Sequence, residues 1–251
     1  VEPFSLDLFV LDDDQYAAKQ YEAFWLKQSV RDKVNLMSHE NYLRPHSRES
    51  MLQRISALQE HFNVRIFVTI REQFRAIWSR YCHDVTIAFC RNALLKDVLA
   101  LGERVQCRWP LCIHKEYTGP CYCQPEHIKA ISLAYYDYHD LYQALLRYFD
   151  EDNIRFFAFE AMKKDNDGFI KSVMDFVDPS GRAGAMTYTL PEKKINARSD
   201  RELQQLKERN ADSMEEIKVR IKARYAESNQ SLNRALNLGL EEFGYPLPDP
   251  A

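Results

Sequence analysis

Hydrophobic residues along the chain follow two patterns: short apolar runs, and longer stretches in which apolar positions recur at helical spacing. Residues 63–81, "NVRIFVTIREQFRAIWSRY", contain both patterns. The run from Val64 to Ile70 is rich in β-branched residues, as expected for a strand buried in a parallel sheet. After Arg71, apolar side chains recur every three or four residues as far as Tyr81, which is typical of a helix. The pattern predicts a buried strand that passes at Arg71 directly into a helix.

The same patterns predict further elements on both sides of this segment. Helices are predicted at residues 12–30, 47–62, 92–102, 126–149, 167–177, 199–227 and 229–243. Strands are predicted at residues 33–38 and 154–160. Strands that alternate with helices indicate βαβ units, and therefore an α/β fold with a parallel central sheet flanked by helices. No repeat or linker interrupts the pattern, so we expect a single domain over residues 1–251.

Composition narrows the classes of protein that remain. The chain has 251 residues, of which 45% are hydrophobic, and a formal net charge of −3. This balance excludes a generally basic nucleic-acid binder, so we expect no nucleic-acid partner. No apolar run approaches the roughly 18 residues that a membrane span needs. We expect a cytoplasmic location, with a Golgi-luminal or secretory location as the alternative, and the sequence leaves the oligomeric state open.

Four of the six cysteines crowd into residues 103–125, which we interpret as a Cys-rich loop or insertion. They are Cys107, Cys112, Cys121 and Cys123. Thiolates with nearby imidazoles can bind zinc, but the spacing here contains CxC and lacks CxxC. We expect free thiols and no bound metal, and keep disulfides and a zinc site as alternatives.

Arg71 is the first candidate for a functional residue. Ligands of parallel α/β sheets collect outside the carboxyl ends of the strands, and Arg71 is predicted to follow such an end. Its planar guanidinium suits phosphate oxygens, and the hydroxyl of Ser79, about two helical turns later, could complete a phosphate cradle. Arg75 either adds to the positive field or is solvated. The alternative is that Arg71 is a surface residue and Ser79 an ordinary helical serine.

Two further segments give this arrangement a family context. Residues 157–169, "FAFEAMKKDNDGF", follow the second predicted strand, and residues 224–236, "RYAESNQSLNRAL", precede Gly244-Tyr245-Pro246. Together with the strand, Arg71 and Ser79, they resemble the PAPS-dependent sulfotransferase superfamily over residues 33–246. The resemblance implies a P-loop NTPase-like sulfotransferase fold. It also implies PAPS as the sulfate donor and a hydroxyl-bearing small molecule or glycan as the acceptor.

The resemblance assigns roles to particular residues. Arg71 and Ser79 would hold the 3′-phosphate of PAPS. The family's glycine-rich loop for the 5′-phosphosulfate is not visible here, so we expect an upstream strand and loop before Val1, with loss of the loop as the alternative. The catalytic base is expected in "MSHENYL", after the strand at 33–38, as His39 or Glu40. Alternatively, Glu40 and Asn41 cap the turn into the next helix.

Three functions of different classes are therefore open. The first is a sulfotransferase that uses PAPS. The second is a PAP- or PAPS-binding relative without catalytic activity. The third is a P-loop-like kinase, which would require a lysine-bearing glycine loop and a magnesium-binding aspartate, and the sequence shows neither motif.

Overall fold

This computed structural model of the protein describes residues 48–87, 94–104, 131–181 and 199–249. The chain forms two compact units, each built from two separate stretches. Unit 1 comprises Val1–Ile70 and Tyr138–Ala185, and unit 2 comprises Arg71–Asp137 and Met186–Ala251. The single domain over residues 1–251 stays a prediction.

Unit 1 contains a parallel pair of strands, as the apolar runs predict. Strand β1, Ile66–Ile70, pairs with β2, Ile154–Ala158, and Ile66 lies opposite Ile154. The pairing confirms both predicted strands within the described residues and the α/β fold. The second strand ends earlier than expected, because Glu160 belongs to helix α7, Phe159–Lys164. The predicted strand at 33–38 lies outside the described residues.

Four helices and two 3-10 turns complete the described part of unit 1. They are α3 (Arg48–Ala57), η1 (Leu58–Glu60), α6 (Tyr138–Leu146), η4 (Glu151–Asn153), α7 and α8 (Asn166–Val177). Helix α3 contacts α6, and Arg48 forms an ion pair with Asp140 between them. Helix α8 begins at a side-chain cap, since the carboxylate of Asp165 accepts the N–H of Gly168 at 3.0 Å.

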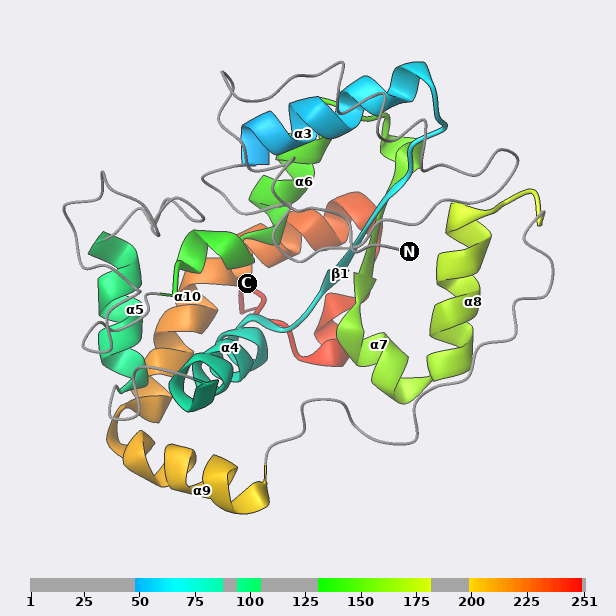
Figure 1. The fold of residues 1–251 in the computed structure, drawn as a ribbon. Coiled ribbons are helices and arrows are strands. Elements are labelled where there is room, and N and C mark those ends of the chain that lie inside the picture. The colour runs from blue at the N-terminus through cyan, green and yellow to red at the C-terminus, as the bar shows by residue number, and fades with distance from the viewer. Residues whose placement is uncertain (1–47, 88–93, 105–130, 182–198, 250–251) are drawn as a thin grey trace. The chain divides into compact units, whose positions relative to one another are not determined.

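Unit 2 is helical in its described part. Its elements are α4 (Gln73–Ile87), α5 (Leu95–Arg104), η3 (Leu133–Tyr136), α9 (Asp200–Arg209), α10 (Ala211–Leu236) and η5 (Leu240–Phe243). The long helix α10 packs against α4 (Figure 1). Ile77 and Tyr81 of α4 and Tyr225 of α10 are all 0% exposed. The predicted helix after Arg71 is therefore confirmed, and its apolar stripe forms part of the core.

The prediction of one long helix at 126–149 is wrong in its described part. Within residues 131–149, the chain forms η3, interrupts the helix at Asp137, and then forms α6. Asp137 is extended, with φ −83° and ψ 91°, and its carboxylate accepts the hydroxyl of Ser228 at 2.6 Å. The Tyr225 hydroxyl donates to the carbonyl of Leu133 at 2.6 Å. These two hydrogen bonds to α10 stabilise the extended conformation between η3 and α6, which a continuous helix would not allow.

The predicted helix boundary near residue 228 is also wrong. Helix α10 runs through that point to Leu236, and the break lies at Asn210, between α9 and α10. The side chain of Asn210 is 1% exposed and bonds to groups outside both helices. Its Oδ1 accepts the N–H of Leu95 at 2.7 Å, and its Nδ2 donates to the Tyr81 hydroxyl at 3.0 Å. The break is therefore set by tertiary hydrogen bonds.

Candidate functional site

The side chain of Glu72 caps the N-terminus of helix α4. The Glu72 side chain is buried, and its residue is 7% exposed. Its Oε1 accepts the N–H of Phe74 at 2.8 Å, and its Oε2 accepts the N–H of Arg75 at 2.9 Å. Helix starts leave such N–H groups without an intrahelical partner, so this carboxylate caps the helix and complements its dipole. The cap fixes the helix start at Gln73, two residues after Arg71.

The cap also determines how an anion can bind here. The first turn of a helix commonly binds phosphate through its backbone N–H groups. In α4, the carboxylate of Glu72 already accepts two of them. An anion at this end of α4 must therefore be bound chiefly by side chains, and Arg71 is the cation directly before the cap.

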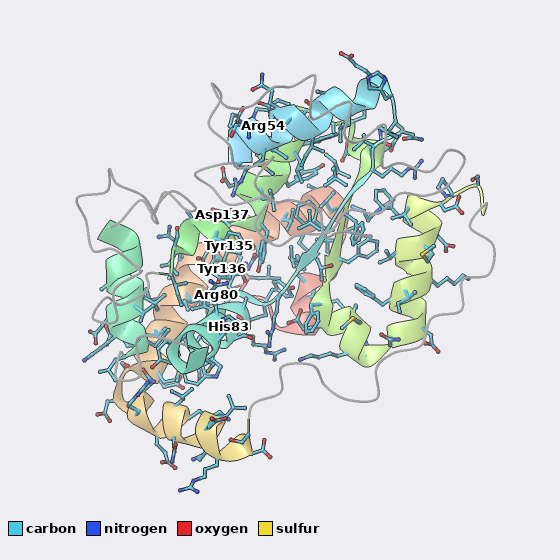
Figure 2. All side chains as sticks on the ribbon, viewed as in Figure 1. Arg54, Arg80, His83, Tyr135, Tyr136 and Asp137 are labelled. Carbon is cyan, nitrogen blue, oxygen red and sulfur yellow. The ribbon has the colours of Figure 1, made fainter. Side chains whose placement is uncertain are left out.

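Arg75 and Ser79 lie four residues apart and so share one face of α4. The Nε of Arg75 lies 3.7 Å from Oε2 of Glu72, and 56% of the Arg75 side chain is exposed. Ser79 is half-buried, and lies about 9 Å along the helix axis from the first residue of α4. His83 is exposed on the same face, one turn further on. Figure 2 shows His83 on α4, with Arg80 near it.

The first residue of α4 is fastened by a buried pair of amides. Nε2 of Gln73 donates to Oδ1 of Asn229 at 2.6 Å, and Nδ2 of Asn229 donates back to Oε1 of Gln73 at 3.1 Å. Both side chains are 0% exposed. Nδ2 of Asn229 also donates to the carbonyl of Pro246 at 2.9 Å, and Nε2 of Gln73 lies 3.5 Å from the carbonyl of Tyr136. The pair joins the start of α4 to α10, η3 and the C-terminal segment.

The buried amide of Asn210 forms a second set of contacts with α4, at Tyr81. The hydroxyl of Tyr81 accepts from Nδ2 of Asn210 and from a guanidinium nitrogen of Arg209, each at 3.0 Å. Asn210 also binds the first backbone N–H of α5. Two points of α4, eight residues apart, are thus held by hydrogen-bonded side chains. Ser79 lies between these two points, and Arg71 lies two residues before the first of them.

Comparison with protein families identifies this architecture. The family model of the sulfotransferase domain matches residues 24–235, which is most of the chain. The chain belongs to the sulfotransferase domain family. A comparison with curated proteins finds no significant match. The matched range includes β1, β2, α4 and nearly all of α10, so it confirms the predicted family and fold and supports sulfotransfer as the activity.

Within the sulfotransferase domain, three of the five predicted site residues lie in the part of the chain that the structure describes. Arg71, Arg75 and Ser79 lie on one short segment, while His39 and Glu40 lie outside the described residues. The roles of all five stay predictions.

Sequence reasoning missed the contacts of Gln73 and Asn229. A signal for Asn229 was present, because this polar residue interrupts an apolar stripe that runs through Ile221, Tyr225 and Leu232. The conspicuous "SN" and "GYP" motifs are connected in the structure, since Asn229 bonds to the carbonyl of Pro246.

The described residues of the sulfotransferase domain also bear on metal binding, on the cysteines and on membrane-spanning helices. In the described part of the chain, no group of three or more His, Cys, Asp or Glu side chains is arranged to hold a metal ion. Cys82 is buried and forms no disulfide bond within the described residues, and the other five cysteines lie outside the described ranges. The expectation of no metal therefore stays a prediction. No helix among the described residues has the length and apolar character needed to cross a membrane.

Proposed function

We propose that this protein transfers a sulfuryl group from PAPS to a hydroxyl group of a sugar or another alcohol. One observation carries the proposal: Arg71 directly follows the parallel strand β1 and directly precedes the capped start of α4. A permanent cation at the carboxyl end of a parallel strand suits a phosphate ligand. Membership of the sulfotransferase domain family indicates which phosphate-bearing donor is expected.

The donor's 3′-phosphate is the group that this segment binds. Arg71 supplies a planar set of N–H donors, and the Ser79 hydroxyl supplies one more donor. Because the Glu72 carboxylate already accepts the backbone N–H groups of Phe74 and Arg75, affinity for this phosphate depends mainly on the two side chains. Arg75 remains largely exposed beside Glu72 and contributes to the positive field.

The transfer itself needs a proton acceptor at the other end of the donor. The acceptor oxygen attacks the sulfur and forms a new S–O bond, while the bond from sulfur to the 5′-phosphate oxygen of PAPS breaks. PAP leaves with the electron pair of that bond, and the hydroxyl proton passes to a base. We assign the base to His39 or Glu40, which follow the predicted strand at 33–38.

A transfer assay with two labelled donors tests this function. The protein is incubated with ³⁵S-labelled PAPS and a panel of sugars and simple alcohols, and in parallel with γ-³²P-labelled ATP. We expect label to move from PAPS to a hydroxyl-bearing acceptor, and no transfer from ATP. Transfer from ATP instead would establish the kinase alternative. Tight PAP binding without transfer to any acceptor would favour the inactive relative.

A further inference from the structure

The buried amide pair of Gln73 and Asn229 has a consequence for the donor site. Gln73 is the first residue of α4 and lies two residues after Arg71. Its side chain makes a reciprocal pair of hydrogen bonds with Asn229, at 2.6 and 3.1 Å. Both residues are 0% exposed, so water cannot replace either partner if one is removed.

The surrounding contacts give the pair a single arrangement. Asn229 uses its Nδ2 for two acceptors, Oε1 of Gln73 and the carbonyl of Pro246, and its Oδ1 for Nε2 of Gln73. Rotating either amide by 180° would set donor against donor and acceptor against acceptor. The two amides therefore fix each other's orientation, and with it the position of the Gln73 backbone.

We propose that Asn229 is a positioning residue for the donor site and acts on Arg71 through Gln73. This inference rests on the proposed function of Arg71 in binding the 3′-phosphate. Between Gln73 and Arg71 there is only Glu72, whose carboxylate is itself tied to the first turn of α4. The backbone on the C-terminal side of Arg71 is thus held by two buried side chains. The guanidinium of Arg71 can bind the phosphate through two parallel hydrogen bonds only if this backbone stays in place.

The C-terminal segment that contains Tyr245 and Pro246 also contributes to the orientation of Asn229. The carbonyl of Pro246 accepts from Asn229, and the neighbouring Tyr245 is 4% exposed. Displacing this segment removes one of the three bonds that orient the Asn229 amide. The donor site is therefore coupled to the segment that contains Tyr245 and Pro246.

A double-mutant cycle measured by calorimetry with PAP tests the proposal. The four proteins are wild type, Asn229→Ala, Arg71→Ala and the double variant, each assayed well below its melting temperature. We expect Asn229→Ala to weaken PAP binding about tenfold, which corresponds to about 1.4 kcal/mol. In the Arg71→Ala background the same substitution should change the PAP dissociation constant less than about twofold, because both act through one group.

A matched control lies one turn along the same helix. Asn233 accepts the N–H of Leu240 at 3.1 Å and donates to Glu241 at 2.9 Å, with no bond to α4 among these contacts. Asn233→Ala should leave PAP affinity unchanged. If Asn229→Ala does not fold, Gln73→Met keeps the side-chain volume, removes the amide at the α4 end, and should weaken PAP binding to a similar extent.

The outcomes separate this inference from the function on which it rests. Wild type that binds PAP through Arg71, with Asn229→Ala and Gln73→Met at wild-type affinity, would overturn the positioning role alone. Equal losses from Asn229→Ala in both backgrounds would also overturn it, since the effect would then not pass through Arg71. Failure of wild type to bind PAP would overturn both proposals.

Discussion

Removing the carboxylate of Glu72 should weaken the start of helix α4, on which the candidate site depends. Glu72→Ala deletes both side-chain acceptors that cap this helix, at 2.8 and 2.9 Å from the N–H groups of Phe74 and Arg75. The glutamate is 7% exposed, so water has little access to the two N–H groups in the variant. We therefore expect lower stability, arising at the helix start.

The size of the loss follows from the capping interaction. Losing an N-terminal cap costs about 0.5–2 kcal/mol, and a carboxylate at the helix N-terminus adds about 0.3–1 kcal/mol through the dipole. Together these terms predict that Glu72→Ala lowers the free energy of unfolding by about 1–3 kcal/mol. At about 2–4 °C per kcal/mol for a chain of this size, the melting temperature should fall by about 2–12 °C. Glu72→Gln keeps one acceptor and should lose about half as much.

Urea unfolding followed by circular dichroism measures these differences. Arg75→Ala is the matched control, because it removes only a largely exposed ion pair with a 3.7 Å separation, worth at most about 1 kcal/mol. The order of stability should be wild type, then Arg75→Ala, then Glu72→Gln, then Glu72→Ala. A Glu72→Ala variant as stable as wild type, or an Arg75→Ala variant that loses as much as Glu72→Ala, would refute the capping argument.

Three other predictions address the donor, the base and the core. Ser79→Ala removes one neutral hydrogen-bond donor and should cost about 0.5–1.5 kcal/mol of PAP binding free energy in calorimetry. One of His39→Ala and Glu40→Gln should lower turnover at least about 10²-fold with PAP affinity unchanged, and normal turnover in both would place the base elsewhere. Burial and the hydrogen bond to Glu151 raise the pKa of Tyr142 from 10.0 to about 12. The stability that this tyrosine adds over Tyr142→Phe should thus be present below about pH 10 and lost as pH rises toward 12, and a difference that stays constant in urea unfolding across that range would exclude this linkage.

The sequence was most informative where the chain is apolar and regular. The β-branched run that ends at Ile70 predicted β1, and the helical spacing up to Tyr81 predicted α4. Both signals come from burial of neighbouring residues, which a local pattern records directly. The same reasoning placed Arg71 at the junction between strand and helix.

The missed features depend on partners that are distant in the sequence. The interruption at Asp137 is fixed by Ser228, and the break at Asn210 by Tyr81 and the N–H of Leu95. Local helix propensity does not record such hydrogen bonds. The pattern therefore predicted helices that run through both breaks, and a boundary near residue 228 where helix α10 is continuous.

The sequence predicted some residues of the candidate site and missed the contacts of others. Arg71 and Ser79 were found because their spacing from a strand is a local property. The capping role of Glu72 and the support of Gln73 by Asn229 were not, since both follow from side-chain geometry after folding. A polar residue within the apolar stripe of α10 is the one local sign that a buried partner was required.

The central claim is that Arg71 binds the 3′-phosphate of the sulfate donor. Calorimetric titration of wild type and Arg71→Ala with PAP tests it directly, and Arg75→Ala serves as the control for loss of a nearby charge. We expect Arg71→Ala to weaken PAP binding by about 1.5–3 kcal/mol, the usual contribution of hydrogen bonds to a charged group. Arg75→Ala should cost markedly less, because its side chain is largely exposed. Equal PAP affinity in wild type and Arg71→Ala would contradict the account.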